Sequence, residues 1–113
     1  MERYLIFVIS FALGVFLGYS AKANDQLPPP EYDHPFNGTL KVERVPLARI
    51  YSHCAAMYYE SGMGPPSQFV MACQRMENGG RTCHIIMPDY HPYYPIEMIF
   101  RHENGHCNGW VHE

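Results

Sequence analysis

A histidine–glutamate motif near the carboxyl end of the chain holds the side chains best suited to metal chemistry. His102 and His106 are four positions apart and enclose Glu103, which gives the pattern H-E-x-x-H. On a helix, residues i and i+4 share one face with their Cβ atoms about 5–6 Å apart, so both imidazoles can bind one metal ion. Glu103 is turned by about 100° from His102 on a helix. We expect it to flank the metal and to accept a proton from water.

A third potential ligand follows a turn signal. Asn108 and Gly109 predict the end of the helix, because glycine readily adopts the left-handed conformation of a helix terminus. The reversed chain can bring His112 back toward the metal, and the complete string becomes H-E-x-x-H-x-x-G-x-x-H. Glu113 is the alternative third ligand. Three protein ligands and one open position are typical of a catalytic zinc ion, so Zn2+ is the expected cofactor.

This string resembles the zinc-binding signature of the metzincin branch of the zinc metallopeptidases. The resemblance implies zinc ligands at His102, His106 and His112, a general base at Glu103 and a chain-reversing glycine at Gly109. It also implies a minimal zincin-like fold and a peptidase that hydrolyses peptide or protein substrates with a zinc-activated water. The longer stretch RHENGHCNGW is similar to small bacterial and phage proteins with an RHExGHCNGW-type signature.

Two further groups of residues are candidates for substrate contacts. In zincins a strand beside the active-site helix pairs with extended substrate, and the resemblance assigns this role to the strand expected over 82–87. His84 on that strand either faces substrate or, by the two-residue alternation of strands, faces solvent. The aromatic loop that follows contains Tyr90, Tyr93 and Tyr94. Their hydroxyls are candidates to stabilise an oxyanion, with packing as the alternative role.

The elements that must position these residues follow from hydrophobic spacing and turn signals. Alternating and continuous apolar runs predict strands over 40–45, 69–76 and 81–87, and helical spacing predicts helices over 47–60 and from Ile96 onward. The sequence Glu-Asn-Gly-Gly between the last two strands is a hairpin turn signal. The order β-α-β-β-α indicates an α+β domain with the metal motif on its last helix.

The amino-terminal part of the chain predicts export. Residues 1–23 are typical of a signal peptide: the uncharged apolar run Tyr4–Tyr19 is followed by Ala-Lys-Ala, which places cleavage before Asn24. An uncleaved anchor in the inner membrane, with the domain facing outward, is the alternative, and it would be the only membrane contact. Residues 24–38 are proline-rich and are predicted to be a spacer, which leaves 39–113 as the domain. The expected location is extracytoplasmic, either periplasmic or secreted.

Four cysteines in a short exported chain predict two disulfides. They are Cys54, Cys73, Cys83 and Cys107. Three pairings are possible and the spacing does not choose among them. We favour Cys83–Cys107 with Cys54–Cys73. The first bridge would hold the third strand against the last helix. A zinc site made of all four thiolates is disfavoured, since no two cysteines have the short spacing of such sites.

Composition excludes some function classes and leaves alternatives to the peptidase. A net charge of −3 with only 8 Lys and Arg argues against a nucleic-acid-binding protein. The main alternative is a non-catalytic zinc-binding envelope interaction module, in which Glu113 completes a four-ligand structural site. The absence of a metzincin methionine turn after His112 favours this alternative. A metal carrier role for the histidine-rich tail is a third hypothesis.

Overall fold

The structure, a computed structural model, describes residues 26–111 as a three-stranded sheet with two main helices. The elements in chain order are η2 (Pro30–Tyr32), β1 (Thr39–Val45), η3 (Leu47–Arg49), α3 (Ile50–Glu60), β2 (Cys73–Glu77), η4 (Asn78–Gly80), β3 (Thr82–Pro88) and α4 (Ile96–Cys107). The predicted α+β class and the order of strands and helices are confirmed. The specific zincin-like topology stays a prediction.

The strand that comes last in sequence lies in the middle of the sheet. The strand order is β1-β3-β2. β1 runs parallel to β3, and β2 runs antiparallel to β3. The predicted hairpin turn joins β2 to β3 as η4, where Asn78, Gly79 and Gly80 all have positive φ. Because β3 is paired on both sides and covered on both faces, nearly all of its residues are buried.

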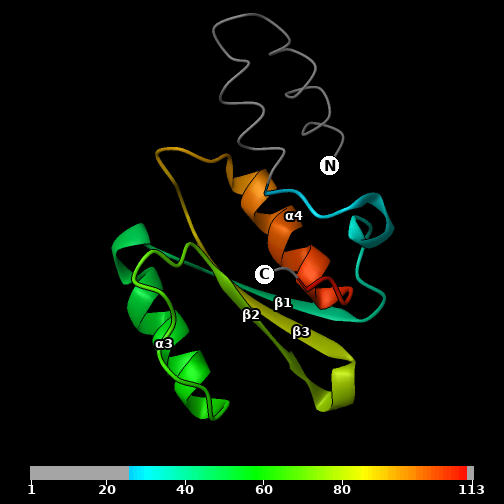
Figure 1. Ribbon diagram of the computed structural model, residues 1–113, viewed down its shortest axis with the longest axis horizontal. Helices are drawn as coiled ribbons and strands as arrows, with labels where there is room; N and C mark the ends of the chain where they lie inside the picture. The colour runs from blue at the N-terminus through cyan, green and yellow to red at the C-terminus, as the bar shows by residue number, and fades with distance from the viewer. Residues whose placement is uncertain (1–25, 112–113) are drawn as a thin grey trace, which may run out of the picture.

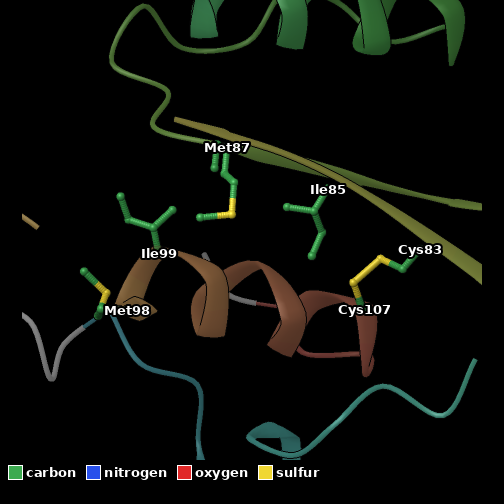
Figure 2. Packing of buried hydrophobic residues seen from close by; sticks show 7 residues of the cluster. Cys83, Ile85, Met87, Met98, Ile99 and Cys107 are labelled. Carbon is green, nitrogen blue, oxygen red and sulfur yellow. A yellow bond between two sulfur atoms is a disulfide. The ribbon is translucent and has the colours of Figure 1, made fainter. Parts of the chain in front are cut away.

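Helices α3 and α4 cover opposite faces of the sheet, so the domain has three layers (Figure 1). Alternate residues of β3 point to the two faces. Ile85 and Met87 point toward Ile99 of α4 (Figure 2). Ile86 packs with Ile50 and the rest of the α3 side. Each face therefore has its own apolar core, and α4 is fixed by one of them.

One disulfide ties each helix to the sheet. Cys54–Cys73 joins α3 to β2, and Cys83–Cys107 joins β3 to the last residue of α4. The Cα atoms of both pairs are 5.9 Å apart, which is within the usual range for disulfides. The favoured pairing is the one observed. Two disulfides indicate an oxidising, extracytoplasmic compartment.

The amino-terminal residues of the described chain pack against α4. We call Gln26–Phe36 the N-terminal strap; it lies beside α4 in Figure 1 (cyan). Leu27 and Phe36 pack against the core on the α4 side, and Pro28 is buried. The prediction of a spacer is therefore wrong for this segment. The carbonyls of Gln26 and His34 in this segment accept hydrogen bonds from side chains of α4.

The predicted signal peptide or anchor, residues 1–23, lies outside the described residues. Within 26–111, no helix has the length and apolar character needed to cross a membrane.

Candidate metal centre

Helix α4 places the histidine–glutamate motif in its last two turns. Pro95 precedes the first helical residue, and Glu97 lies in the first turn, where an acidic residue is favourable. The helix ends at Cys107, and Gly109 then adopts φ 104°. The amide of Trp110 donates to the carbonyl of Gly105 at 3.0 Å, which closes the turn. The predicted glycine stop is confirmed, and the chain reverses there.

The two imidazoles point their Nε2 atoms at each other. His102 Nε2 and His106 Nε2 are 3.2 Å apart, and the ring planes are inclined at 79°. Each ring also contacts a backbone carbonyl through Nδ1: His102 contacts the carbonyl of Gln26, and His106 contacts that of Trp110 at 2.7 Å. A carbonyl oxygen only accepts, so each Nδ1 donates. In the neutral rings the lone pairs are then on the two Nε2 atoms.

This arrangement fits two ligands of one metal ion. Nitrogen ligands at about 2.0–2.1 Å from a tetrahedral zinc ion are about 3.3–3.4 Å from each other, and the Nε2–Nε2 distance is 3.2 Å. Metal-binding histidines almost always donate their other ring N–H to a carboxylate, a backbone carbonyl or water. Both His102 and His106 make such a bond. The chemistry of the donor set therefore suits zinc.

Trp110 forms a wall of the site. Its ring stacks on that of His106 with centroids 4.8 Å apart and planes inclined at 10°. It meets the His102 ring edge-on at 5.0 Å. Together with its carbonyl bond to His106, this contact fixes the orientation of the second imidazole. The sequence did not identify this role, because the position of a tryptophan in a motif does not show which atoms it will contact.

Glu103 lies with the histidines but is shielded from water. Glu103, His102 and His106 line one open pocket of about 510 Å³, and Glu103 is 7% exposed. Burial raises the pKa of Glu103 to about 8, because a carboxylate loses solvation in an apolar environment. A cation held by the neighbouring histidines would favour the ionised form. The carboxyl group is thus positioned where a general base is expected.

The rest of the pocket is mainly apolar and lies where β2 begins. Its other lining residues are Tyr58, Met63, Ala72, Cys73, Gln74, Trp110 and Val111. Cys73 and Gln74 are the first residues of β2, which is an edge strand of the sheet. The pocket therefore opens beside a sheet edge.

The strand expected to pair with substrate is in the wrong place for that role. β3 contains the predicted segment 82–87, but it is the central strand, paired to both β1 and β2. A central strand has no free edge for a peptide. The available edge next to the histidine pair is β2. The sequence did not show this, because the parallel pairing of β1 with β3 joins residues about forty positions apart.

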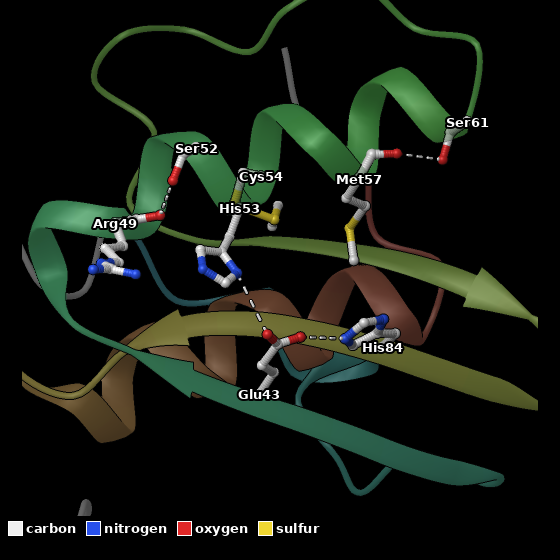
Figure 3. Close-up of a disulfide and its surroundings, with 9 residues drawn as sticks. Glu43, Arg49, Ser52, His53, Cys54, Met57, Ser61 and His84 are labelled. Atoms are coloured by element: carbon white, nitrogen blue, oxygen red, sulfur yellow. Dashed lines mark hydrogen bonds and ion pairs between the residues drawn. A yellow bond between two sulfur atoms is a disulfide. The ribbon is translucent and has the colours of Figure 1, made fainter.

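His84 lies on the sheet face opposite α4. Its Nε2 is 3.1 Å from Glu43, and its Nδ1 is 3.2 Å from Glu77. Figure 3 shows the Glu43 carboxylate between His84 and His53. His84 therefore belongs to a polar cluster on the α3 side and is separated from the histidine pair by the sheet. A role for it in substrate contact at the pocket is not supported.

The aromatic loop lies at the far end of α4. It leads into the first turn of the helix, whereas the histidine pair lies in the last two turns. Tyr90 and Tyr93 are 65% and 67% exposed, and Tyr94 packs against the apolar core. Among the described residues, the lining of the pocket includes none of these three tyrosines. The structure does not bring the oxyanion candidates to the site. His91 Nδ1 accepts from the amides of Tyr93 and Tyr94, and burial lowers the pKa of His91.

The predicted third ligand lies beyond the part of the chain that the structure describes. His112 and Glu113, the two candidates, both follow residue 111. Within 26–111, no group of three or more His, Cys, Asp or Glu side chains is arranged to hold a metal ion. The described residues thus include two of the predicted ligands, His102 and His106, and the assignment of His112 remains a prediction.

Comparisons with protein-family models, with curated proteins and with solved structures found no match to this chain.

Proposed function

We propose that the protein is an exported zinc-dependent metallopeptidase. One observation carries the proposal: two imidazoles on one helix face are fixed by carbonyls at Nδ1 and bring their Nε2 atoms to 3.2 Å. His102 and His106 would hold Zn2+, together with His112 as the sequence predicts. The metzincin-like spacing of the motif supports the same ligand set.

Glu103 is the residue proposed to move protons. Bound zinc supplies a Lewis acid that polarises a carbonyl and activates water. The Glu103 carboxylate accepts the proton of the attacking water and returns it to the nitrogen of the leaving amine. Its position in the same pocket as the histidine pair supports this role. Its low exposure keeps bulk water from competing for the proton.

The sheet edge beside the pocket suits an extended peptide. β2 is an edge strand, and its first two residues line the pocket. An extended peptide can add to such an edge through main-chain hydrogen bonds. This would lay its backbone across the mouth of the pocket. The edge strand β2 thus takes the place that the sequence assigned to the strand over 82–87.

The proposal is tested with purified, oxidised protein. Zinc content is measured for the wild type and for His106→Ala, and cleavage of a mixed peptide library is followed by mass spectrometry. Glu103→Gln is compared with Glu97→Gln, a matched control in the first turn of the same helix. One zinc per chain, lost in His106→Ala, with cleavage abolished in Glu103→Gln and retained in Glu97→Gln, supports the peptidase. Tight zinc binding without cleavage supports the envelope interaction module instead. No zinc binding overturns both.

A further inference from the structure

The two histidines are oriented by different parts of the chain. His106 donates to the carbonyl of Trp110, four residues further along the same turn. His102 donates to the carbonyl of Gln26, which is 76 positions away in sequence. The orientation of His106 is therefore local to α4, whereas that of His102 depends on how the N-terminal strap is held.

The strap is attached to α4 by side chains that lie around the histidines. Asp33 forms an ion pair with Arg101, which directly precedes His102. Their side chains are 19% and 12% exposed, respectively. The Nδ2 atom of Asn104 donates to the carbonyl of His34 at 2.7 Å. These contacts alternate with the histidines along the helix, so the face that carries them is built to hold the strap.

A further side chain and a glycine complete the attachment. Asn108 Nδ2 donates to the carbonyls of Tyr32 at 2.9 Å and His34 at 2.7 Å. A Cβ atom at Gly105 would lie 2.6 Å from Cβ of Pro28, which is closer than real Cβ atoms approach. Glycine at this position lets the strap pass directly against the helix.

These contacts give a structural role to the residues of the motif that are neither proposed metal ligands nor the proposed general base. Within the stretch RHENGHCNGW, all residues other than His102, Glu103 and His106 make contact with the strap, the sheet or the turn that ends the helix. Arg101, Asn104, Gly105 and Asn108 all meet the strap. The motif therefore binds the strap in addition to carrying the proposed metal ligands.

We propose that the N-terminal strap is a positioning element of the histidine pair. The Gln26 carbonyl selects the His102 ring orientation and the tautomer protonated at Nδ1, which directs Nε2 toward His106. The Asp33–Arg101 ion pair holds that carbonyl in place. Only the consequence for zinc affinity rests on the proposed function; the orientation of the ring does not.

Three variants of the full chain test this role. Asp33→Ala removes the acceptor of Arg101 and leaves the histidines unchanged. The double variant Asp33→Arg with Arg101→Asp exchanges the two charges and restores an ion pair. Asp89→Ala is the matched control, because it removes one carboxylate from an exposed ion pair with Arg44, and neither residue lines the pocket of the histidine pair. Circular dichroism selects a temperature at which every variant is folded.

The first readout needs no metal. Proton–nitrogen correlation spectra of the imidazole rings report the tautomer of each histidine in metal-free protein at slightly alkaline pH. In Asp33→Ala, His102 is expected to exchange between tautomers while His106 keeps its proton at Nδ1. The charge exchange should restore the wild-type spectrum of His102, and Asp89→Ala should not alter it. An unchanged His102 tautomer in Asp33→Ala, or a folded exchange variant that fails to restore it, overturns the positioning role.

The second readout is zinc affinity. Loss of an outer contact to a metal-binding histidine typically weakens binding by about 10–100-fold, and we expect this in Asp33→Ala with recovery in the exchange variant. If wild type binds zinc and Asp33→Ala binds it equally well, the strap proposal is wrong and the proposed zinc site stands. If wild type binds no zinc, the proposed function is wrong, and the imidazole spectra alone decide the role of the strap.

Discussion

Cys107, the residue directly after His106, is bonded through its sulfur to Cys83 in the central strand. The disulfide thus anchors the end of α4 to the most buried strand of the sheet, one residue from a proposed metal ligand. The second disulfide, between Cys54 and Cys73, ties α3 to the opposite face. The two bridges are similar in loop length, but only Cys83–Cys107 is attached to α4 next to a proposed ligand, which allows a matched comparison.

Removing either disulfide should lower the free energy of unfolding by a similar amount, but removing Cys83–Cys107 should weaken zinc binding more. Each bridge closes a loop of about twenty residues and is expected to stabilise the fold by about 3 kcal/mol. Replacing both Cys83 and Cys107 by Ala should lower the free energy of unfolding by about that amount and weaken zinc binding as well. Replacing both Cys54 and Cys73 by Ala should lower stability with a smaller effect on zinc. Urea denaturation and zinc titration measure the two quantities, and equal effects on zinc would contradict the anchoring role.

Gly105→Ala should destabilise the protein although alanine favours helices. The added Cβ would lie 2.6 Å from Pro28 and 3.1 Å from the Trp110 ring. Overpacking of this kind typically costs about 1–3 kcal/mol, which exceeds the gain of about 1 kcal/mol in helix propensity. Gly64→Ala is the control, because nothing lies within 4 Å of a Cβ there. Thermal unfolding should rank Gly105→Ala below wild type and leave Gly64→Ala close to it.

The intrinsic fluorescence of the protein should report zinc binding. The chain has one tryptophan, and its ring stacks on His106 at 4.8 Å. A cation bound to that imidazole changes the electrostatic environment of the indole, so zinc should change the emission of Trp110. His106→Ala should abolish the change, whereas His53→Ala, on the other face of the sheet, should retain it. A fluorescence titration that is identical in His106→Ala and wild type would exclude this geometry.

Glu77 should contribute stability that depends on pH. A hydrogen bond from Arg75 is the main cause that lowers the pKa of Glu77 below its usual 4.5, with a smaller contribution from His84. A carboxylate with a lowered pKa in the folded state stabilises the fold above its unfolded pKa. That contribution is lost as the pH falls from about 4.5 through the lowered value.

Glu77→Gln should therefore be less stable than wild type at neutral pH, and the difference should shrink in acid. Urea denaturation between about pH 7 and pH 3 measures it. The control is Glu60→Gln, which removes a more exposed carboxylate from the same guanidinium. We expect a smaller change in the free energy of unfolding for this variant. A difference between Glu77→Gln and wild type that stays constant with pH would contradict the assignment.

The arrangement of the histidine pair could be predicted in part from the sequence. The spacing of His102 and His106 fixes two imidazoles on one helix face, and Gly109 marks where that helix ends. These are short-range properties, since helix periodicity and turn conformation depend on neighbours within a few residues. The tautomers of the two rings could not be predicted from the sequence, because the carbonyl that accepts from His102 belongs to Gln26, which is 76 positions away.

By itself the sequence determined the order of strands and helices, the glycine-rich hairpin, the need for two disulfides and the placement of H-E-x-x-H on the last helix. Only the tertiary structure decided that β3 is the central strand, that His84 lies on the face away from α4, and that the N-terminal strap packs on the H-E-x-x-H motif. Local patterns constrain each element because the relevant energies act between near neighbours. Strand order and strap docking depend instead on contacts between distant residues, which become visible only when the chain is folded.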